Sequence, residues 1–345
     1  MTKQKQPPLV LRHERYYKDI CLMAVPLLGM AWFYYGLRPV LMGAAAFVLG
    51  SLCDRLVCLL RRRPHLPQDY SSECFALLIA LLLPPACSWY VLAAAVLAGV
   101  LVGKEVFGGY GSYPFHPAAV GFAVAAVSWP EEVFRYVAPG TKLPLWDASG
   151  VATTRSISEV LQNGGLPSVS GLEMVVGNYA GAIGTTALLV ILACALYLLV
   201  RRDIGLYAPL GYLAACAAIA FVFPRQTVLA GTSLFATLGP RLNLVRYELM
   251  SGGLLFGAMF LLGEPFTTPR QHRGGRFLYG ILLGAMTMGF RYYGAYSSSI
   301  CFALLAINGI SEWLDGMIDP LYAGLGALYR RLRRNTRKEG GANAS

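Results

Sequence analysis

Two segments of this 345-residue chain combine residue types that could bind a ligand. Residues 107–117 place three glycines among four aromatic residues and end in His116-Pro117. Glycine allows a backbone to approach a ligand closely and to offer its N–H groups, and aromatic faces suit a flat ring. A turn at a membrane interface has the same composition, so this pattern leaves both interpretations open. Residues 147–154 end in Thr153 and Thr154, and either hydroxyl could be esterified to a phosphate or could simply be solvated.

Two carboxylates lie in or beside apolar segments. Glu264 stands in the segment 263–269, where a short apolar stretch ends. Ionisable groups at membrane depth are candidates for an ion path, although an interfacial pair with Arg270 or Arg273 is the structural alternative. Asp54 lies inside an apolar stretch and is followed by Arg55. We expect a pair that reaches the surface there, with an ion path as the alternative.

The composition excludes several classes of protein. Hydrophobic residues make up 56% of the chain and charged residues 14%, with a mean hydropathy of +0.53. A soluble domain carries about 25% charged residues. Intrinsic disorder, a disulfide scaffold and an ordinary cytosolic enzyme are therefore excluded. The composition predicts a polytopic protein of the lipid bilayer.

The net charge of +11 does not indicate nucleic-acid binding, because the basic residues stand in short segments between apolar stretches. That distribution is typical of orientation in a membrane. None of the eight cysteines forms a Cys-x-x-Cys pair, so no metal site is expected. We also identify no catalytic acid, base or nucleophile.

Ten apolar segments predict an all-α polytopic fold. Five precede a long polar stretch and five follow it, so the two halves have opposite orientation, as in two inverted five-helix repeats. The third segment of each half is short and rich in glycine or proline, which points to a central binding site. The segments cover residues 19–35, 39–60, 72–86, 88–103, 117–130, 180–200, 206–223, 249–263, 277–290 and 297–314.

The basic residues also predict the orientation. With the N-terminus inside, 21 of the 29 Lys and Arg residues face the cytoplasm and 8 face out, which places both termini in the cytoplasm. The predicted parts are an N-terminal segment, a first membrane repeat, an extracytoplasmic loop, a second membrane repeat and a basic tail. They cover residues 1–18, 19–130, 131–179, 180–318 and 319–345.

Four separated motifs resemble one family of membrane proteins. Their order and spacing are similar to the D subunit of the Rnf complex and to its paralogue, the B subunit of the sodium-pumping NADH:quinone reductase Nqr. The resemblance extends from about residue 20 to 320. It rests on FGGYGSYPFHPAAVGFAVAAVSWP (107–130), DASGVAT (147–153), LMSGGLLFGAMFLLGEPFTTP (249–269) and RYYGAYSSSICFALLAIN (291–308).

The resemblance implies a ten-helix flavoprotein with FMN joined to a threonine through a phosphoester on the outer face. A flavin transferase attaches that FMN in proteins of this family, at an Asp followed by four variable residues and Ala-Thr. Asp147, Ala152 and Thr153 match this spacing, so Thr153 is the expected acceptor. The residues around it depart from the family pattern, which leaves Thr154 as a rival. The same departures keep open a paralogue that has lost its flavin.

The resemblance further implies a second, non-covalent flavin, riboflavin or FMN, near the inner face. The residues expected to line its site surround the glycine-rich turn: Lys104, Phe107, Gly108, Gly109, Gly111 and His116. His116 stands where the family has Asn, and Glu264 stands where it has Asp. Two flavins near opposite faces would carry electrons across the bilayer.

The expected function is therefore that of a membrane subunit of an ion-translocating ferredoxin:NAD oxidoreductase in a bacterial cell membrane. The implied partners are the other membrane and peripheral subunits of the Rnf complex and the flavin transferase. The coupling ion, Na⁺ or H⁺, stays open. The alternatives are the B subunit of the quinone reductase and a transporter of inverted-repeat type without redox chemistry.

Overall fold

The computed structural model describes residues 8–62, 69–225, 237–251, 253–268, 273–294 and 300–311, together with Trp313 and Gly316. The described chain is mostly helical, as the composition predicted. The basic tail 319–345 and the beginning of the N-terminal segment lie outside the described residues.

The first half of the chain forms five helical segments that match the predicted apolar stretches closely. Proline stands in the first turn of α2 and of α5, where its missing N–H has no helical partner to lose. The segment α4 continues into a π-helix, η1, which leads directly into the glycine-rich turn. The bounds are α1 Pro8–Tyr35, α2 Arg38–Leu60, α3 Ser71–Leu82, α4 Trp89–Leu97, η1 Ala98–Glu105 and α5 Pro117–Ser128.

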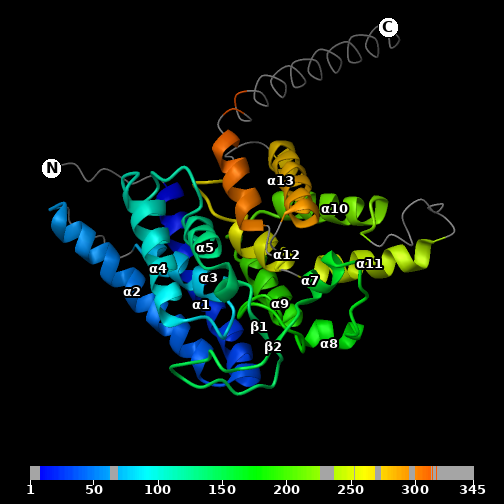
Figure 1. Cartoon of the computed structure of the whole chain (residues 1–345). Coiled ribbons are helices and arrows are strands. Elements are labelled where there is room, and N and C mark those ends of the chain that lie inside the picture. Colours follow the sequence, from blue (N-terminus) through cyan, green and yellow to red (C-terminus); the bar gives the residue numbers. More distant parts are fainter. Residues whose placement is uncertain are drawn as a thin grey trace, which may run out of the picture.

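The second half lies beside the first, on the right of Figure 1 from green to orange. The helices α10 and α13 pack against one another. Glycines make this approach possible, since a Cβ at Gly280 would lie 2.2 Å from the Ala208 carbonyl oxygen. The bounds are α9 Leu188–Val200, α10 Tyr207–Val222, α11 Leu238–Met250, α12 Leu254–Phe256, η2 Gly257–Leu261 and α13 Arg273–Tyr293, followed by a helix at Ile300–Ser311.

Among the described residues, one helix is both long and apolar enough to cross a membrane by itself: α2, Arg38–Leu60. A second candidate span arises if α11 and the Leu254–Leu261 segment, bent by 61°, are counted together. The remaining apolar helices are shorter. The helix α3, with 12 residues, is about 18 Å long against the roughly 30 Å of a hydrocarbon core. The ten-span inverted repeat therefore stays a prediction.

The short helix α3 forms the centre of the protein, because all of its residues are buried. A turn of the second half, at residues 183–185, bonds to the end of this helix. The Ile183 N–H donates to the Leu83 carbonyl at 3.0 Å, and the Gly184 N–H donates to the Leu81 carbonyl at 2.8 Å. The sequence predicted a helix from residue 180, whereas α9 begins at Leu188. The free carbonyls at the end of α3 thus join the two halves.

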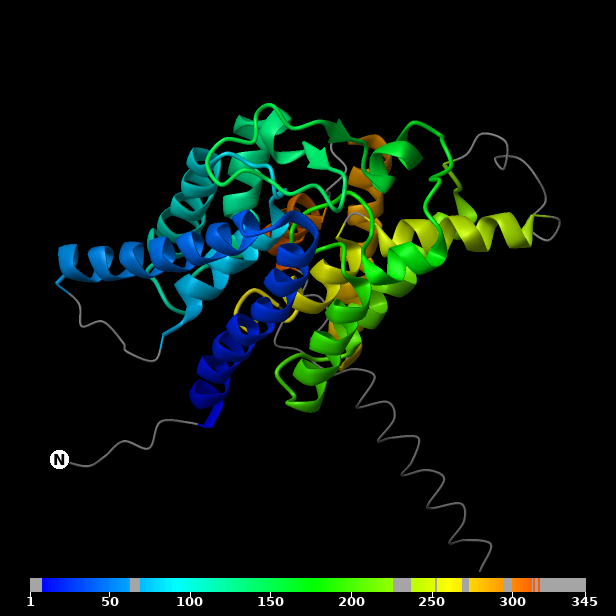
Figure 2. The same cartoon turned by 90° about the horizontal axis from the view of Figure 1, so that it is seen from below.

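The polar stretch 131–179 folds over the C-terminal end of α1. Its elements are α6 Pro130–Val133, β1 Tyr136–Val137, β2 Thr153–Thr154, α7 Ile157–Gln162 and α8 Gly171–Val176. The Gly140 and Leu143 N–H groups donate to the carbonyls of Tyr34 and Tyr35. In Figure 2 this stretch lies beside the corner where α1 and α2 meet. It is therefore anchored to the end of one long helix.

A buried ion cluster joins α11 to α13. Glu248 lies between Arg291 (Nε to Oε2, 2.9 Å) and Arg225 (Nε to Oε1, 3.3 Å). Arg291 also donates to the Ser158 hydroxyl of α7 at 2.6 Å. The sequence pattern predicted no helix over most of α11, because the polar residues of this segment lower its hydropathy below that of the neighbouring apolar stretches. The second half thus contains a charged helix that hydropathy alone misses.

Candidate functional site

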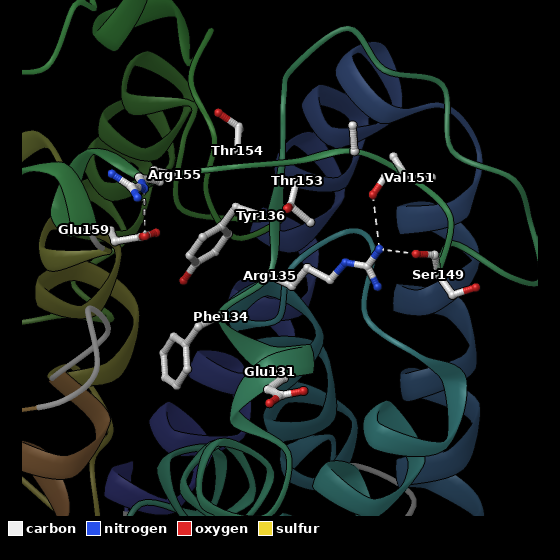
Figure 3. A pocket seen from close by; sticks show the side chains of 11 residues that line it. Glu131, Phe134, Arg135, Tyr136, Ser149, Val151, Thr153, Thr154, Arg155 and Glu159 are labelled. Atoms are coloured by element: carbon white, nitrogen blue, oxygen red, sulfur yellow. Dashed lines mark hydrogen bonds and ion pairs between the residues drawn. The ribbon is translucent and has the colours of Figure 1, made fainter.

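A surface cavity of about 760 Å³ opens between α6, the strand pair and α7, and it contains both candidate threonines (Figure 3). Two aromatic residues, two arginines and two glutamates also line it. The two arginines and two glutamates balance in formal charge, and Ser149, Thr153 and Thr154 carry aliphatic hydroxyls. The lining residues are Glu131, Phe134, Arg135, Tyr136, Ser149, Val151, Ala152, Thr153, Thr154, Arg155 and Glu159.

Arg135 holds the loop that precedes the threonines. Its Nη2 donates to the carbonyl oxygens of Ala148 (3.3 Å), Ser149 and Val151 (3.1 Å). Three carbonyls on one guanidinium nitrogen fix the curvature of the segment 148–151. The sequence analysis did not identify Arg135, since nothing in its local pattern shows which carbonyls it meets.

Asp147 begins the same loop with a tight turn. The Ser149 N–H donates to the Asp147 carboxylate at 2.9 Å, and this bond lowers the pKa of the exposed carboxyl below its ordinary value. Asp147 is therefore ionised at neutral pH. It lies at the surface and does not line the cavity.

The strand β2 presents both candidate acceptors. Thr153 pairs with Val137 and Thr154 with Tyr136 in an antiparallel ladder, and both threonines are exposed. Successive side chains of a strand point to opposite sides. In Figure 3 Thr153 lies between Tyr136 and Arg135, whereas the Thr154 side chain points away from them. Thr154 also lines a second cavity of about 320 Å³. Thr153 lines the larger cavity and not the second one, so the geometry favours it over Thr154.

The glycine-rich turn is shaped by contacts within the protein. Gly108, Gly109 and Gly111 have φ angles of +120°, +90° and +75°, which side chains rarely adopt. A Cβ at Gly111 would lie 3.0 Å from the Phe266 ring, and one at Gly109 would lie 3.4 Å from the Glu105 carboxylate. Phe107, by contrast, is 42% exposed and its ring lies 6.3 Å from that of Phe115. The accessible side of this turn is therefore its aromatic tip.

Lys104, expected at a flavin site, has a buried ammonium with three hydrogen-bond partners, and the Glu105 carboxylate lies 3.7 Å away. Its Nζ lies 2.9 Å from Asp54, 3.0 Å from Asp69 and 2.7 Å from the Ser72 hydroxyl. Asp54 is also buried, so the surface pair expected from its neighbouring arginines is wrong. An opposite charge within hydrogen-bond distance compensates each buried charge, whereas Asp54 left without Lys104 would be costly.

Glu264 is the most densely bonded carboxylate among the described residues. The hydroxyls of Tyr17 and Tyr113 each lie 2.8 Å from Oε1, and they lie 2.6 Å from one another. Oε2 accepts from the Phe266 N–H at 2.9 Å and from the Thr267 hydroxyl at 2.7 Å. Of the two arginines considered as interfacial partners, Arg270 lies outside the described residues. The sequence analysis did not identify Tyr17 and suggested Tyr113 only as an aromatic face of the glycine-rich turn, because both lie far from Glu264 along the chain.

His116 begins α5 with its side chain fully buried. Its ring lies 5.5 Å from that of Phe75, and neither ring nitrogen has a hydrogen-bond partner among the described residues. Phe75 in turn contacts Tyr17 and Tyr113 at 5.7 and 5.5 Å between ring centres. The glycine-rich turn, Glu264 and His116 thus surround one buried aromatic cluster.

The two regions lie at opposite ends of α1. Tyr17 contacts Glu264, whereas Tyr35 contacts the polar stretch that contains the threonines. Tyr17 and Tyr35 are separated by roughly 27 Å along a regular helix, close to the roughly 30 Å of a bilayer core. The contacts with Glu264 and with the polar stretch are therefore separated along α1 by about the thickness of a bilayer core.

Comparison with known proteins gives a consistent result. A family model described as NQR2, RnfD, RnfE matches residues 10–324. The chain is 30% identical over 327 residues to the D subunit of the ion-translocating oxidoreductase complex of Pseudomonas paraeruginosa, covering 90% of this chain and 91% of that protein. The protein of the same name from Pseudomonas aeruginosa is 31% identical over 313 residues, covering 85% and 86%. The D subunit of the proton-translocating ferredoxin:NAD(+) oxidoreductase complex of Clostridium ljungdahlii is 24% identical over 315 residues, covering 89% and 90%.

Proposed function

The chain belongs to the NQR2, RnfD, RnfE family, and from this premise we propose that it is the flavin-carrying membrane subunit of an ion-translocating ferredoxin:NAD oxidoreductase. The main support is the match of the family model to residues 10–324. The alignments with D-subunit relatives add to it, because they cover most of the length of those proteins. The other membrane and peripheral subunits of such a complex are its proposed partners.

We propose Thr153 as the attachment point of FMN. The residues of the cavity fit this group. About 760 Å³ lies within the usual size of a small-molecule site, Phe134 and Tyr136 supply aromatic faces, and arginines supply positive charge for a phosphate. Asp147 and Ala152 complete the spacing that a flavin transferase would recognise on this exposed loop. A bound flavin would supply one-electron chemistry that no side chain here provides.

The attachment requires an activated donor. In the proposed reaction the Thr153 oxygen forms a bond to the FMN phosphorus of a flavin dinucleotide, and the pyrophosphate P–O bond breaks. The adenosine monophosphate leaves, and the hydroxyl proton passes to a base of the transferase. The exposure of Thr153 supports this assignment, because a second protein must reach the hydroxyl.

We propose the second, non-covalent flavin at the opposite end of α1, against Phe107 and the exposed side of the glycine-rich turn. Gly109 and Gly111 would hold the shape of this turn, while Lys104 would supply a buried positive charge to the flavin site. His116 retains unpaired ring nitrogens beside the turn. We expect Phe107→Ala to lower the flavin released by denaturation without changing the covalent flavin. Unchanged release would remove Phe107 from this site.

The ion path is proposed near the same end, with Glu264 and Asp54 as its charged residues. Both carboxylates are buried, and each is bonded to groups that an ion would have to replace. The ten-helix inverted repeat, with cytoplasmic termini and an outer acceptor loop, belongs to the same proposal. The roughly 27 Å between Tyr17 and Tyr35 along α1, close to the thickness of a bilayer core, supports it.

Mass spectrometry of the acceptor peptide tests the proposed function. Cleavage after Lys142 and Arg155 releases residues 143–155, which contain Thr153 and Thr154. We expect the added mass of FMN on Thr153 in protein produced with a flavin transferase. A peptide that stays unmodified would favour a paralogue that has lost its flavin or a transporter without redox chemistry. The family also includes the quinone-reductase subunit, which is therefore the alternative function. The similar proteins are named as D subunits, and this favours the ferredoxin enzyme.

A further inference from the structure

The two arginines of the acceptor cavity differ in what they contact. Arg135 is engaged by three backbone carbonyls of the acceptor loop. Arg155 contacts the Glu159 carboxylate, with 3.5 Å between Nε and Oε1. The Arg155 side chain is 71% exposed and that of Glu159 is 41% exposed. Of these two cations, Arg155 is the one that can turn toward a newly bound anion.

Arg155 is also correctly placed along the chain. It follows Thr153 by two residues and stands directly after the end of β2. Both line the larger cavity, in which Figure 3 draws Arg155 beside Glu159. An anion attached to the Thr153 hydroxyl would therefore lie in or beside the cavity that Arg155 also lines.

We propose that Arg155 binds the phosphoryl anion of the flavin nucleotide on Thr153, and that Glu159 is its counter-ion before the flavin arrives. This inference rests on the proposed function. A phosphodiester keeps one negative charge, and a guanidinium donates two parallel N–H bonds to its oxygens. An exposed ion pair such as Arg155–Glu159 contributes little, so a phosphoryl anion can displace the carboxylate.

The proposal assigns different roles to two residues that touch. Arg155 acts on the phosphoryl group, whereas Glu159 competes for Arg155. Arg155→Gln should therefore slow flavin attachment, and Glu159→Gln should leave it unchanged or make it faster. If Arg155 instead acted only through a structural pair with Glu159, both variants would lose flavin equally. Lys142→Gln is a matched control, because it removes one exposed positive charge from the same stretch outside the cavity.

The experiment follows attachment in cells that produce the full chain with a flavin transferase. In-gel flavin fluorescence, divided by the amount of chain in the membrane, is measured over time. We expect Arg155→Gln to attach flavin about tenfold more slowly, the factor that the loss of one charge-assisted bond gives. Arg155→Lys should recover part of the rate, and Lys142→Gln should match wild type.

A second readout is the reduction potential of the covalent flavin in the purified chain. Loss of the adjacent positive charge should move it to a more negative value in Arg155→Gln, because reduction adds negative charge to the flavin. Arg155 is also a tryptic site, so the flavin peptide of this variant is prepared with chymotrypsin. Wild-type attachment and potential in Arg155→Gln, or equal losses in the Arg155 and Glu159 variants, would overturn this inference alone. A wild-type chain without flavin on Thr153 would overturn the proposed function and this inference with it.

Discussion

The two ends of α1 carry polar clusters of opposite character. At the Tyr35 end, the acceptor cavity is open, and its two threonines are exposed. At the Tyr17 end, Glu264 is buried and already accepts bonds from phenol, hydroxyl and backbone donors. The groups of the open cluster can form hydrogen bonds and ion pairs with an incoming ligand. The groups of the buried cluster already bond to one another, and these bonds join α1, the glycine-rich turn and the break after η2.

Polar residues thus have two roles in this protein: they join helices in the interior, and they can bind a ligand at the surface. Buried polar groups must be paired, since each unpaired group costs free energy. A site that receives a ligand instead needs groups whose partners are exchangeable, such as Arg155 with Glu159. We therefore expect substitutions at the acceptor cavity to change flavin content, and substitutions at the buried cluster to change stability.

The largest effect is expected from Thr153→Val, which removes the hydroxyl that forms the phosphoester. Covalent flavin fluorescence in a denaturing gel should be lost completely, while the chain stays in the membrane. Thr154→Val is the matched control and should keep wild-type fluorescence. The reverse result would move the attachment point by one residue.

Glu264→Leu should destabilise the protein by about 3–5 kcal/mol, because it leaves buried phenol and N–H donors without their acceptor. The matched change at the exposed carboxylate, Glu159→Leu, should stay within about 0.5 kcal/mol. Thermal unfolding of the detergent-solubilised chain, followed by tryptophan fluorescence, compares the two variants. Equal effects would remove the distinction between a buried and an open cluster.

Arg135→Gln should loosen the acceptor loop and lower stability by about 1–2 kcal/mol, because three carbonyls lose a shared donor at a partly exposed site. Hydrogen exchange of residues 147–155 should become faster, with α13 unchanged as an internal reference. Wild-type protection of the loop would show that its curvature does not depend on Arg135.

The smallest effect concerns pH at Asp203, in the connection between α9 and α10. Burial and the nearby Asp19 carboxyl raise the pKa of Asp203 from 3.8 to about 6, while Arg15 and Arg201 oppose this rise. The fold therefore favours the protonated form. Its stabilising contribution is complete below the ordinary pKa and disappears as pH rises through about 6. Melting temperatures measured between about pH 5 and pH 7 should fall less in Asp203→Asn than in wild type. Melting temperatures that fall equally with pH in the variant and in wild type would show that Asp203 does not cause this pH dependence.

The sequence predicted the elements that are marked by apolar stretches and prolines. The predicted segment 39–60 corresponds to α2, Arg38–Leu60, and 206–223 corresponds to α10, Tyr207–Val222. It did not predict most of α11, whose Arg241 and Glu248 break the apolar pattern although both are buried. Hydropathy measures what a side chain prefers when unpaired, so it cannot recognise charges that are buried because they are paired.

The candidate site was predicted in its parts and not in its contacts. The spacing from Asp147 to Thr153 pointed to residues 147–153, and Thr153 lines the cavity, while its role as the flavin acceptor stays a prediction. The roles of Arg135, Tyr17 and Asp69 depend on partners that are distant in sequence or belong to the backbone. A single sequence carries no signal for such pairings. The partner of Lys104 was missed for the same reason.

The central claim is that the acceptor loop and the glycine-rich turn face opposite sides of the membrane. Ser149 and Ser112 are exposed residues of these two regions and suit cysteine labelling. In a cysteine-depleted chain, a membrane-impermeant maleimide should label Ser149→Cys in intact cells and Ser112→Cys only after permeabilisation. Labelling of both positions in intact cells, or of Ser112→Cys alone, would contradict the account.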